Sequence, residues 1–336
     1  MSKPCVFSLF TAFCLSLLTA AASDAQEDVV ATVNGHGITF REFRRSLLEH
    51  RAVVFSYFNH QFGAAKDQGE FWRRSFDGEV PLEKLRKLTL DASVRIKMQQ
   101  LLALEKGLVR DASHAAFLSG LEEENRRRKK AARNQEAIYG PVEYSESTGF
   151  AHLFSLLVVR LKQRLADDDF EITVATLRNF YEANKEQFKQ QDYVMLHGLR
   201  ARDTDAQETL CRLAHQLRDG VGLTESMQDK PIGLVYFKQS LGDTAKGGEQ
   251  TDDFDLPAEV RELPMGAISL FEQESELFLI QLVARREMGY YPFDDKLQRV
   301  LQRRYVDLAY ERLIAQRVNE AEVVVNELVY DRVMAH

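Results

Sequence analysis

The stretch that decides the fold is residues 29–40, which read Val-Val-Ala-Thr-Val-Asn-Gly-His-Gly-Ile-Thr-Phe. Short β-type runs lie on either side of Asn34-Gly35, and Asn-Gly between such runs is the strongest short-range signal for a β-hairpin. Thr39 is followed three residues later by Glu42, which forms a capping box and predicts that a helix begins directly after the second strand. The sequence therefore predicts a hairpin that leads into a helix.

The hairpin needs a further strand beside it. From the hairpin to about residue 189 the pattern is almost entirely helical, so one edge of the hairpin has no nearby partner. Unpaired strand edges promote aggregation, and proteins usually cover them. Residues 321–326, Ala-Glu-Val-Val-Val-Asn, form the last β-type run of the chain. We therefore expect this run to pair with the hairpin, so that both chain ends build one mostly helical domain.

The middle of the chain has a different pattern. Strand-like runs and helices alternate there in the order β-α-β-α-β-β, at residues 193–199, 204–220, 232–237, 256–263, 267–271 and 277–283. This order predicts a small domain in which the last two strands are antiparallel. The fold class expected for the whole chain is α+β, with this domain inserted into the helical one.

The expected organisation has four segments. Residues 1–25 form a signal peptide, and residues 26–190 form the N-terminal helical domain. Residues 191–290 form the inserted domain, and residues 291–336 supply a helix and a strand that complete the helical domain.

The first 25 residues have the layout of a cleavable secretory signal. Lys3 precedes an apolar core at residues 6–18, and small residues follow with cleavage expected after Ala22 or Ala25. The core is shorter than the roughly 20 residues that a membrane span needs. We therefore expect a soluble, exported protein, periplasmic or otherwise extracytoplasmic, with no integral membrane anchor after cleavage. An uncleaved anchor or a buried N-terminal helix is the alternative.

Composition excludes some classes of partner. The formal net charge of −7 argues against nucleic acid or anionic lipid as the main partner. No histidine or acidic cluster has metal-ligand spacing, and we expect neither a metal nor another cofactor. Two of the three cysteines lie in the signal, so Cys211 has no disulfide partner in the mature chain. Its neighbours Leu210 and Leu213 predict a buried thiol.

These features together resemble the SurA/PrsA family of exported peptidyl-prolyl isomerases and chaperones. Residues 30–43 are similar to the family's N-terminal hairpin and first helix, and residues 321–326 to its closing strand. Residues 177–188 look like the helix that leads into its isomerase domain. The resemblance implies a helical chaperone domain made from both chain ends, with a parvulin-type isomerase domain between them.

The resemblance also implies a site in the inserted domain. His197 matches, within a residue, the family's first core histidine and is the candidate catalytic residue; a histidine with a purely structural role is the alternative. The position of the second histidine holds Phe278, and of the glycine-rich motif only Ile232-Gly233 survives. The expected proline pocket is apolar and consists of Phe237, Leu256, Val260, Phe271 and Phe278.

The chemistry of such a site is modest. Rotation about an X-Pro bond has a barrier of about 18–20 kcal/mol, and lowering it needs no nucleophile, metal or cofactor. An apolar pocket holds the proline ring, while polar groups favour the twisted amide over the planar one. Here the polar half is altered and the apolar half is kept. We therefore expect binding of X-Pro segments, with isomerase activity that is weak or lost.

The leading hypothesis is an extracytoplasmic folding factor that binds unfolded or nascent exported polypeptides. Its apolar groove is expected around Phe71, Trp72 and Phe76, unless these aromatic residues belong to the ordinary core. The competing hypothesis is a non-catalytic scaffold or assembly protein that holds one specific exported partner. An unrelated helical protein would be favoured if residues 193–284 proved helical.

Overall fold

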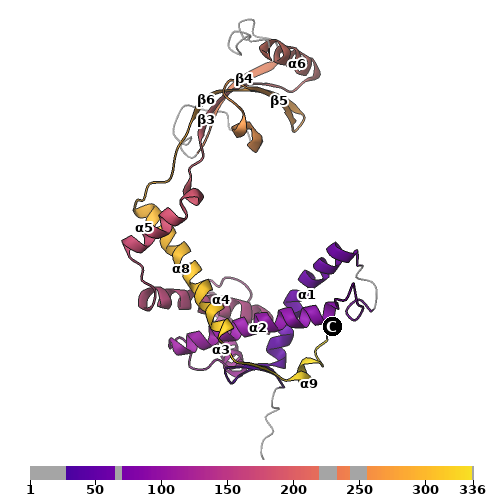
Figure 1. Cartoon of the computed structure of the whole chain (residues 1–336), viewed down its shortest axis with the longest axis vertical. Coiled ribbons are helices and arrows are strands. Elements are labelled where there is room, and N and C mark those ends of the chain that lie inside the picture. Colours follow the sequence, from indigo (N-terminus) through magenta and orange to yellow (C-terminus); the bar gives the residue numbers. More distant parts are fainter. Residues whose placement is uncertain (1–27, 65–69, 219–232, 243–255, 335–336) are drawn as a thin grey trace, which may run out of the picture. The chain divides into compact units, whose positions relative to one another are not determined.

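The computed structural model describes residues 28–64, 70–218, 233–242 and 256–334 (Figure 1). The chain divides into two compact units. Met1–Asp169 and Leu308–His336 form the first, which we call the helical unit, and Phe170–Asp307 form the second, the sheet unit. The predicted α+β class, with both chain ends in one helical body and a sheet-containing insert, is confirmed. The predicted signal peptide lies outside the described residues.

The hairpin forms as expected. Strands β1 (Val29–Val33) and β2 (His36–Thr39) are antiparallel. Asn34 and Gly35 have φ values of 49° and 78°. Positive φ at both central residues is the requirement of a type I′ turn, whose twist matches that of the two strands. The capping box is also present: Thr39 accepts from the Glu42 amide, and the Glu42 side chain accepts from the Thr39 amide. Helix α1 (Phe40–Phe62) therefore begins where the strand ends.

The closing strand also forms. Strand β7 (Val323–Val325) pairs with β1 in antiparallel register, and the sheet order is β2-β1-β7. Main-chain hydrogen bonds frame the pair, from the Asn34 amide to the Glu322 carbonyl and from the Asn326 amide to the Val30 carbonyl, both 2.9 Å long. A short helix, α9 (Glu327–Tyr330), follows. The last strand of the chain thus covers an edge of the first.

Three longer helices complete the helical unit together with the end of α8 (Asp295–Asn319). They are α2 (Pro81–Glu105), α3 (His114–Arg133) and α4 (Glu146–Asp168). Helix α2 packs on α1, and their apolar faces enclose a core with side chains of the hairpin. The buried Tyr310 of α8 donates to the Gln99 side chain of α2 at 2.7 Å.

The aromatic residues that the sequence offered as a groove belong to this core. Phe71 and Phe76 are 2% and 8% exposed, and Phe58 is completely buried. Their rings contact one another at centroid distances of 5.3–6.1 Å. The predicted groove around Phe71, Trp72 and Phe76 is therefore wrong, because these rings pack against each other and leave only Trp72 at the margin.

The sheet unit contains one antiparallel four-stranded sheet of order β4-β3-β6-β5. Its elements are α5 (Val174–Ala183), the 3₁₀ turn η1 (Lys185–Phe188), β3 (Tyr193–Ala201), α6 (Thr204–Arg218), β4 (Leu234–Leu241), the 3₁₀ turn η2 (Ala258–Glu262), β5 (Ile268–Gln273) and β6 (Glu276–Arg286). The short helix expected at residues 256–263 is thus a 3₁₀ turn. Leu177 and Phe188 pack with Leu301 of α8, and α5 together with the part of α8 before Leu308 belongs to this unit.

Each face of the sheet buries its own apolar cluster. Helix α6 covers one face, where Leu199, Leu210 and Leu279 are buried (Figure 1). On the opposite face, Leu196 and Ile280 are buried together with aromatic residues and Val260 of η2. Side chains of a strand alternate between faces, so odd-numbered residues of β3 face α6 and even-numbered ones face η2. Cys211 of α6 is exposed, so the predicted burial of its thiol is wrong.

Candidate functional site

Five apolar residues proposed for the proline pocket come together on the η2 face of the sheet. Phe237, Val260 and Phe278 are buried, and Leu256 and Phe271 are partly buried against them. The ring of Phe278 stacks on Phe271 with a centroid distance of 5.4 Å and an angle of 6°. It also meets the edge of Phe237 at 6.1 Å. We call these five residues the aromatic cluster of the sheet.

A glycine makes room for this cluster. Gly198 of β3 lies opposite Phe237 of β4. A Cβ atom at position 198 would lie 2.1 Å from the Cζ of Phe237, far inside van der Waals contact. The Phe237 ring therefore occupies the space that a side chain at position 198 would fill, and Phe237 is 2% exposed there.

His197 faces the other way. Its neighbours across the sheet are Lys238 of β4 and Gln281 of β6, and its ring meets Tyr236 at 5.7 Å on the α6 face. Burial, with a smaller contribution from Lys238, lowers the pKa of His197. His197 and Phe278 lie on adjacent strands, but Phe278 pairs with Arg200, three residues further along β3. An odd shift of three residues places the two side chains on opposite faces.

Among the described residues, the polar side chains on the face of the aromatic cluster include Arg200, Glu276 and Gln239. Arg200, the register partner of Phe278, lies 3.6 Å from Glu276, and both side chains are about one-fifth exposed. Gln239 of β4 is 2% exposed and shares the face of Phe237. Phe271 is thus the partly exposed ring of the cluster, and a guanidinium, a carboxylate and an amide lie on the same face.

The helical unit carries a groove that the sequence did not point to. A cavity of about 620 Å³ opens between α3, α4 and the chain that leads from α2 into α3, and we call it the α3–α4 groove. Its larger apolar lining residues are Val109, Phe117, Phe150, Leu153, Phe154, Leu156, Leu157 and Val159, and Ala112 and Ala116 also line it. Leu156 and Val159 are 48% and 62% exposed. Apolar side chains are thus held open to solvent at this site.

The three phenylalanine rings of the groove contact one another and a buried arginine. Phe150 stacks on Phe154 at 5.2 Å and meets the edge of Phe117 at 5.3 Å. Behind them, the buried guanidinium of Arg45 lies 3.4 Å from the centroid of Phe150, in a cation–π contact. Burial lowers the pKa of Arg45, while Glu42, Glu146 and Glu49 act in the opposite direction.

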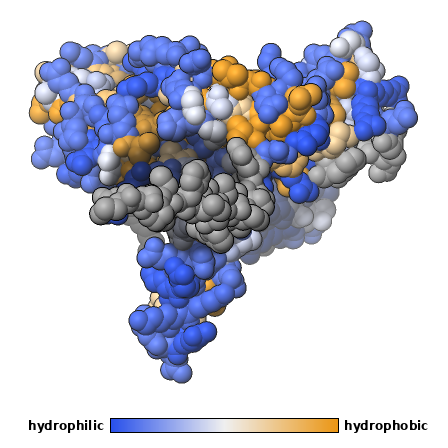
Figure 2. Space-filling view, turned by 90° about the horizontal axis from the view of Figure 1, so that it is seen from below, coloured by the Kyte–Doolittle hydropathy of each residue, from blue (hydrophilic) through white to orange (hydrophobic). Residues whose placement is uncertain are grey.

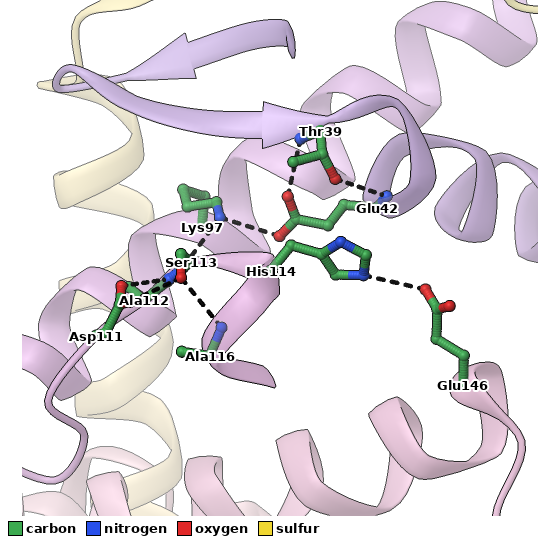
Figure 3. A network of polar contacts seen from close by, with 9 residues as sticks. All are labelled: Thr39, Glu42, Lys97, Asp111, Ala112, Ser113, His114, Ala116 and Glu146. Atoms are coloured by element: carbon green, nitrogen blue, oxygen red, sulfur yellow. Dashed lines mark hydrogen bonds and ion pairs between the residues drawn. The ribbon is translucent and has the colours of Figure 1, made fainter. Parts of the chain in front are cut away.

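A polar network fixes the beginning of α3 beside the groove (Figure 3). Lys97 of α2 contacts Glu42 of α1 at 3.0 Å and donates to the Ala112 carbonyl at 3.2 Å. His114 Nε2 lies 3.0 Å from Glu146 Oε1, which joins the first turns of α3 and α4. Ala112 lines the groove, so the buried Lys97 connects Glu42 of α1 to the main chain at the edge of the groove.

The sequence did contain a signal for this groove. Residues 153–159 read Leu-Phe-Ser-Leu-Leu-Val-Val, which is apolar around most of the helix rather than along one stripe. Leu161 and Leu165 of α4 are completely buried, whereas Val159 is exposed. A helix with an apolar belt wider than its buried face leaves apolar surface for a partner.

Hydrophobic patches are also visible on the outside of the molecule. On the face drawn in Figure 2, hydrophobic residues gather in patches bordered by hydrophilic ones. No helix among the described residues is both long and apolar enough to cross a membrane. Within the same residues, no group of three histidine, cysteine or acidic side chains is placed to hold a metal ion.

Comparison with known proteins gives similarity in structure only. No family model and no curated protein sequence matches the chain. One of two related SurA-like chaperones of Campylobacter jejuni, PEB4 and the periplasmic protein Cj1289, is 12% identical, with a TM-score of 0.32 over 89% of this chain and 98% of that one. The foldase protein PrsA of Lactococcus lactis is 14% identical, with a TM-score of 0.25 over 90% and 96% of the two chains. PrsA of Streptococcus pneumoniae is 13% identical, with a TM-score of 0.23 over 77% and 96%.

Proposed function

We propose that this chain is an extracytoplasmic folding factor that binds apolar segments of unfolded exported polypeptides in the α3–α4 groove. The observation that carries the proposal is the open apolar lining of that groove, with Leu156 and Val159 about half exposed. Isolated apolar side chains are common on protein surfaces, but a concave set backed by three phenylalanine rings is not.

The size of the groove suits a short segment rather than a folded domain. Its volume of about 620 Å³ lies within the range of about 300–1,000 Å³ that is usual for small-ligand pockets. A few apolar side chains of an extended or helical segment fill such a space. Binding of this kind is weak and accepts many sequences, because it depends on buried apolar area rather than on a fixed set of hydrogen bonds.

The sheet unit has a separate proposed role. Its aromatic cluster supports binding of X-Pro segments, since a proline ring packs well on the partly exposed ring of Phe271, which stacks on the buried Phe278. His197 lies on the α6 face of the sheet, so its side chain does not face a proline segment bound on this cluster. Arg200 and Gln239 border the cluster but do not reproduce a pair of histidines. We therefore propose a parvulin-type module that binds proline segments and accelerates their isomerisation weakly or not at all.

The groove is tested by suppression of aggregation. Leu156→Asp with Val159→Asp places charges on exposed side chains of α4, so the fold should persist while apolar clients are rejected. A model unfolded protein should aggregate freely in the presence of this variant and remain soluble with the parent chain. Val53→Asp is the matched control, because Val53 of α1 is 59% exposed and lies outside the groove. Equal activity of all three proteins would exclude the groove as the client site.

The proline module is tested by proline-limited refolding of a substrate protein. Uncatalysed X-Pro isomerisation takes about 10–100 s at 25 °C, so acceleration is easily followed. We expect no acceleration at catalytic amounts and slight acceleration at stoichiometric amounts. Strong catalysis that survives Phe278→Ala would overturn the proposed module.

The scaffold alternative is separated by affinity purification from an exported-protein fraction. A folding factor should retain many unfolded chains weakly, whereas a scaffold should retain one folded partner tightly. Recovery of a single stoichiometric folded partner would replace the folding-factor proposal.

A further inference from the structure

The α3–α4 groove has a cationic border. The charged residues among those that line it are Arg110, Asp111 and Arg160. Arg110 and Arg160 are both exposed, and neither forms an ion pair with another described residue. Two guanidinium groups thus stand beside apolar side chains that are themselves open to solvent.

The carboxylate of the border is already engaged. Asp111 accepts hydrogen bonds from the Ser113 hydroxyl at 2.7 Å and from the Ser113 amide at 2.8 Å. These bonds, the one from the hydroxyl first, lower the pKa of Asp111 and hold it at the start of α3. Asp111 therefore serves the turn before the helix, while the two arginines remain available to a ligand.

Other arginines of the helical unit are used differently. Arg41 pairs with Glu146 and Arg95 with Glu311, each at 2.5 Å, and Arg317 pairs with Glu105 at 3.2 Å. Such pairs join neighbouring helices within the unit. Arg110 and Arg160 make no such link among the described residues, although acidic residues are abundant in the chain.

We propose that the groove selects apolar segments that carry aspartate or glutamate beside their aromatic or aliphatic residues. This inference rests on the proposed function and adds a charge preference to it. The apolar side chains of the client fill the space between α3 and α4, and its carboxylates meet Arg110 and Arg160. Guanidinium groups bind carboxylates through paired hydrogen bonds, which are stronger next to an apolar surface than in free solution. The chain as a whole has a net charge of −7, so two local cations also offset general repulsion of acidic clients.

The preference is tested with short synthetic peptides bound to the full mature chain. Three fluorescent peptides share one leucine- and phenylalanine-rich centre and differ only in flanking aspartate, serine or lysine residues. Anisotropy titrations should give the order aspartate, serine, lysine, from tightest to weakest. We expect each arginine to contribute about three- to fivefold, as partly exposed ion pairs do. Added salt should weaken the aspartate peptide and leave the serine peptide nearly unchanged.

Charge reversal at the border tests the residues directly. Arg110→Glu with Arg160→Glu should invert the order of the three peptides, and Arg110→Gln with Arg160→Gln should abolish it without introducing repulsion. Arg299→Glu with Arg303→Glu, on exposed positions of α8 in the sheet unit, changes the net charge equally and should preserve the order. Circular dichroism confirms that each variant is folded.

The outcomes separate this inference from the proposal on which it rests. Equal binding of all three peptides by the parent chain would overturn the charge preference and leave the groove as a client site. A preference that also disappears in the α8 control would assign the effect to net charge and overturn the role of Arg110 and Arg160. Failure of every peptide to bind, together with no suppression of aggregation, would overturn the folding-factor proposal itself.

Discussion

At the scale of single residues, the helical unit contains a buried ion pair between Lys97 and Glu42. The two side chains are 2% and 7% exposed and lie 3.0 Å apart. Each also bonds to the main chain, Lys97 to the Ala112 carbonyl and Glu42 to the Thr39 amide. Charges buried in this way are tolerated only while they neutralise each other.

Lys97→Met should therefore leave Glu42 as an uncompensated buried charge and lower the free energy of unfolding by about 3–5 kcal/mol. Urea denaturation measures the loss. Adding Glu42→Gln should restore much of it, because the amide oxygen can still accept from Thr39 without carrying a charge. Lys129→Met is the control: Lys129 and Glu143 are 43% and 58% exposed, and loss of their contact should cost about 0–1 kcal/mol. Equal losses in the two single variants would contradict the argument.

His197 should make the stability of the sheet unit depend on pH. Its pKa in the folded protein lies below the ordinary value of 6.5, because burial disfavours the charged ring. The unfolded chain therefore takes up a proton that the folded chain refuses, and stability falls as the pH drops below about 6.5. His197→Gln should reduce this fall. Thermal unfolding at neutral and acidic pH checks it, with His215→Gln on the exposed side of α6 as the control. An unchanged pH dependence in the His197 variant would count against the prediction.

At the scale of elements, the three-residue strand β7 depends on its main chain more than on its side chains. Val323 and Val324 are 37% and 55% exposed. The hydrogen bonds that join Asn34 to Glu322 and Asn326 to Val30 alternate along the pair, so the Val324 amide points toward β1 and the Val323 amide points away.

Proline substitutions should distinguish the two positions. Val324→Pro removes a donor that faces Thr32 and should destabilise the helical unit by about 1–3 kcal/mol. Val323→Pro removes an outward donor and should cost clearly less. Chemical denaturation of both variants measures the difference, and an equal effect would show that the strand is not held by this ladder.

The contrast between predicted and unpredicted elements has a physical origin. The turn at Asn34-Gly35, the capping box at Thr39 and the closing strand could be predicted, because turn geometry, caps and edge pairing are local or obligatory requirements. The α3–α4 groove was not predicted, although the wide apolar belt at residues 153–159 indicates an uncovered apolar surface. The belt does not show which part of the helix face the rest of the fold leaves open. Whether His197 and Phe278 share a face depends on strand register. Phe278 pairs with Arg200, three residues beyond His197, and this odd offset places the two side chains on opposite faces.

At the scale of the whole molecule, the helical unit needs both ends of the chain, whereas the sheet unit is continuous. A chain that stops after residue 307 lacks β7 and the buried Tyr310. The amides of the helical unit should therefore lose their protection from hydrogen exchange, while those of the sheet unit keep it. Amide hydrogen exchange should show fast exchange in β1 and slow exchange in β3. Residues 170–307 expressed alone are the matched comparison and should show the same protection in β3. Slow exchange of β1 in the shortened chain would contradict this account.

The position of β7 beside β1 also orders events during synthesis. The hairpin is synthesised before Val323–Val325, so one of its hydrogen-bonding edges is unpaired while the residues between them are made. The continuous sheet unit can meanwhile become compact and bring the two separated sequences closer together. A product that stops before β7 would keep that edge unpaired, and an unpaired strand edge favours aggregation.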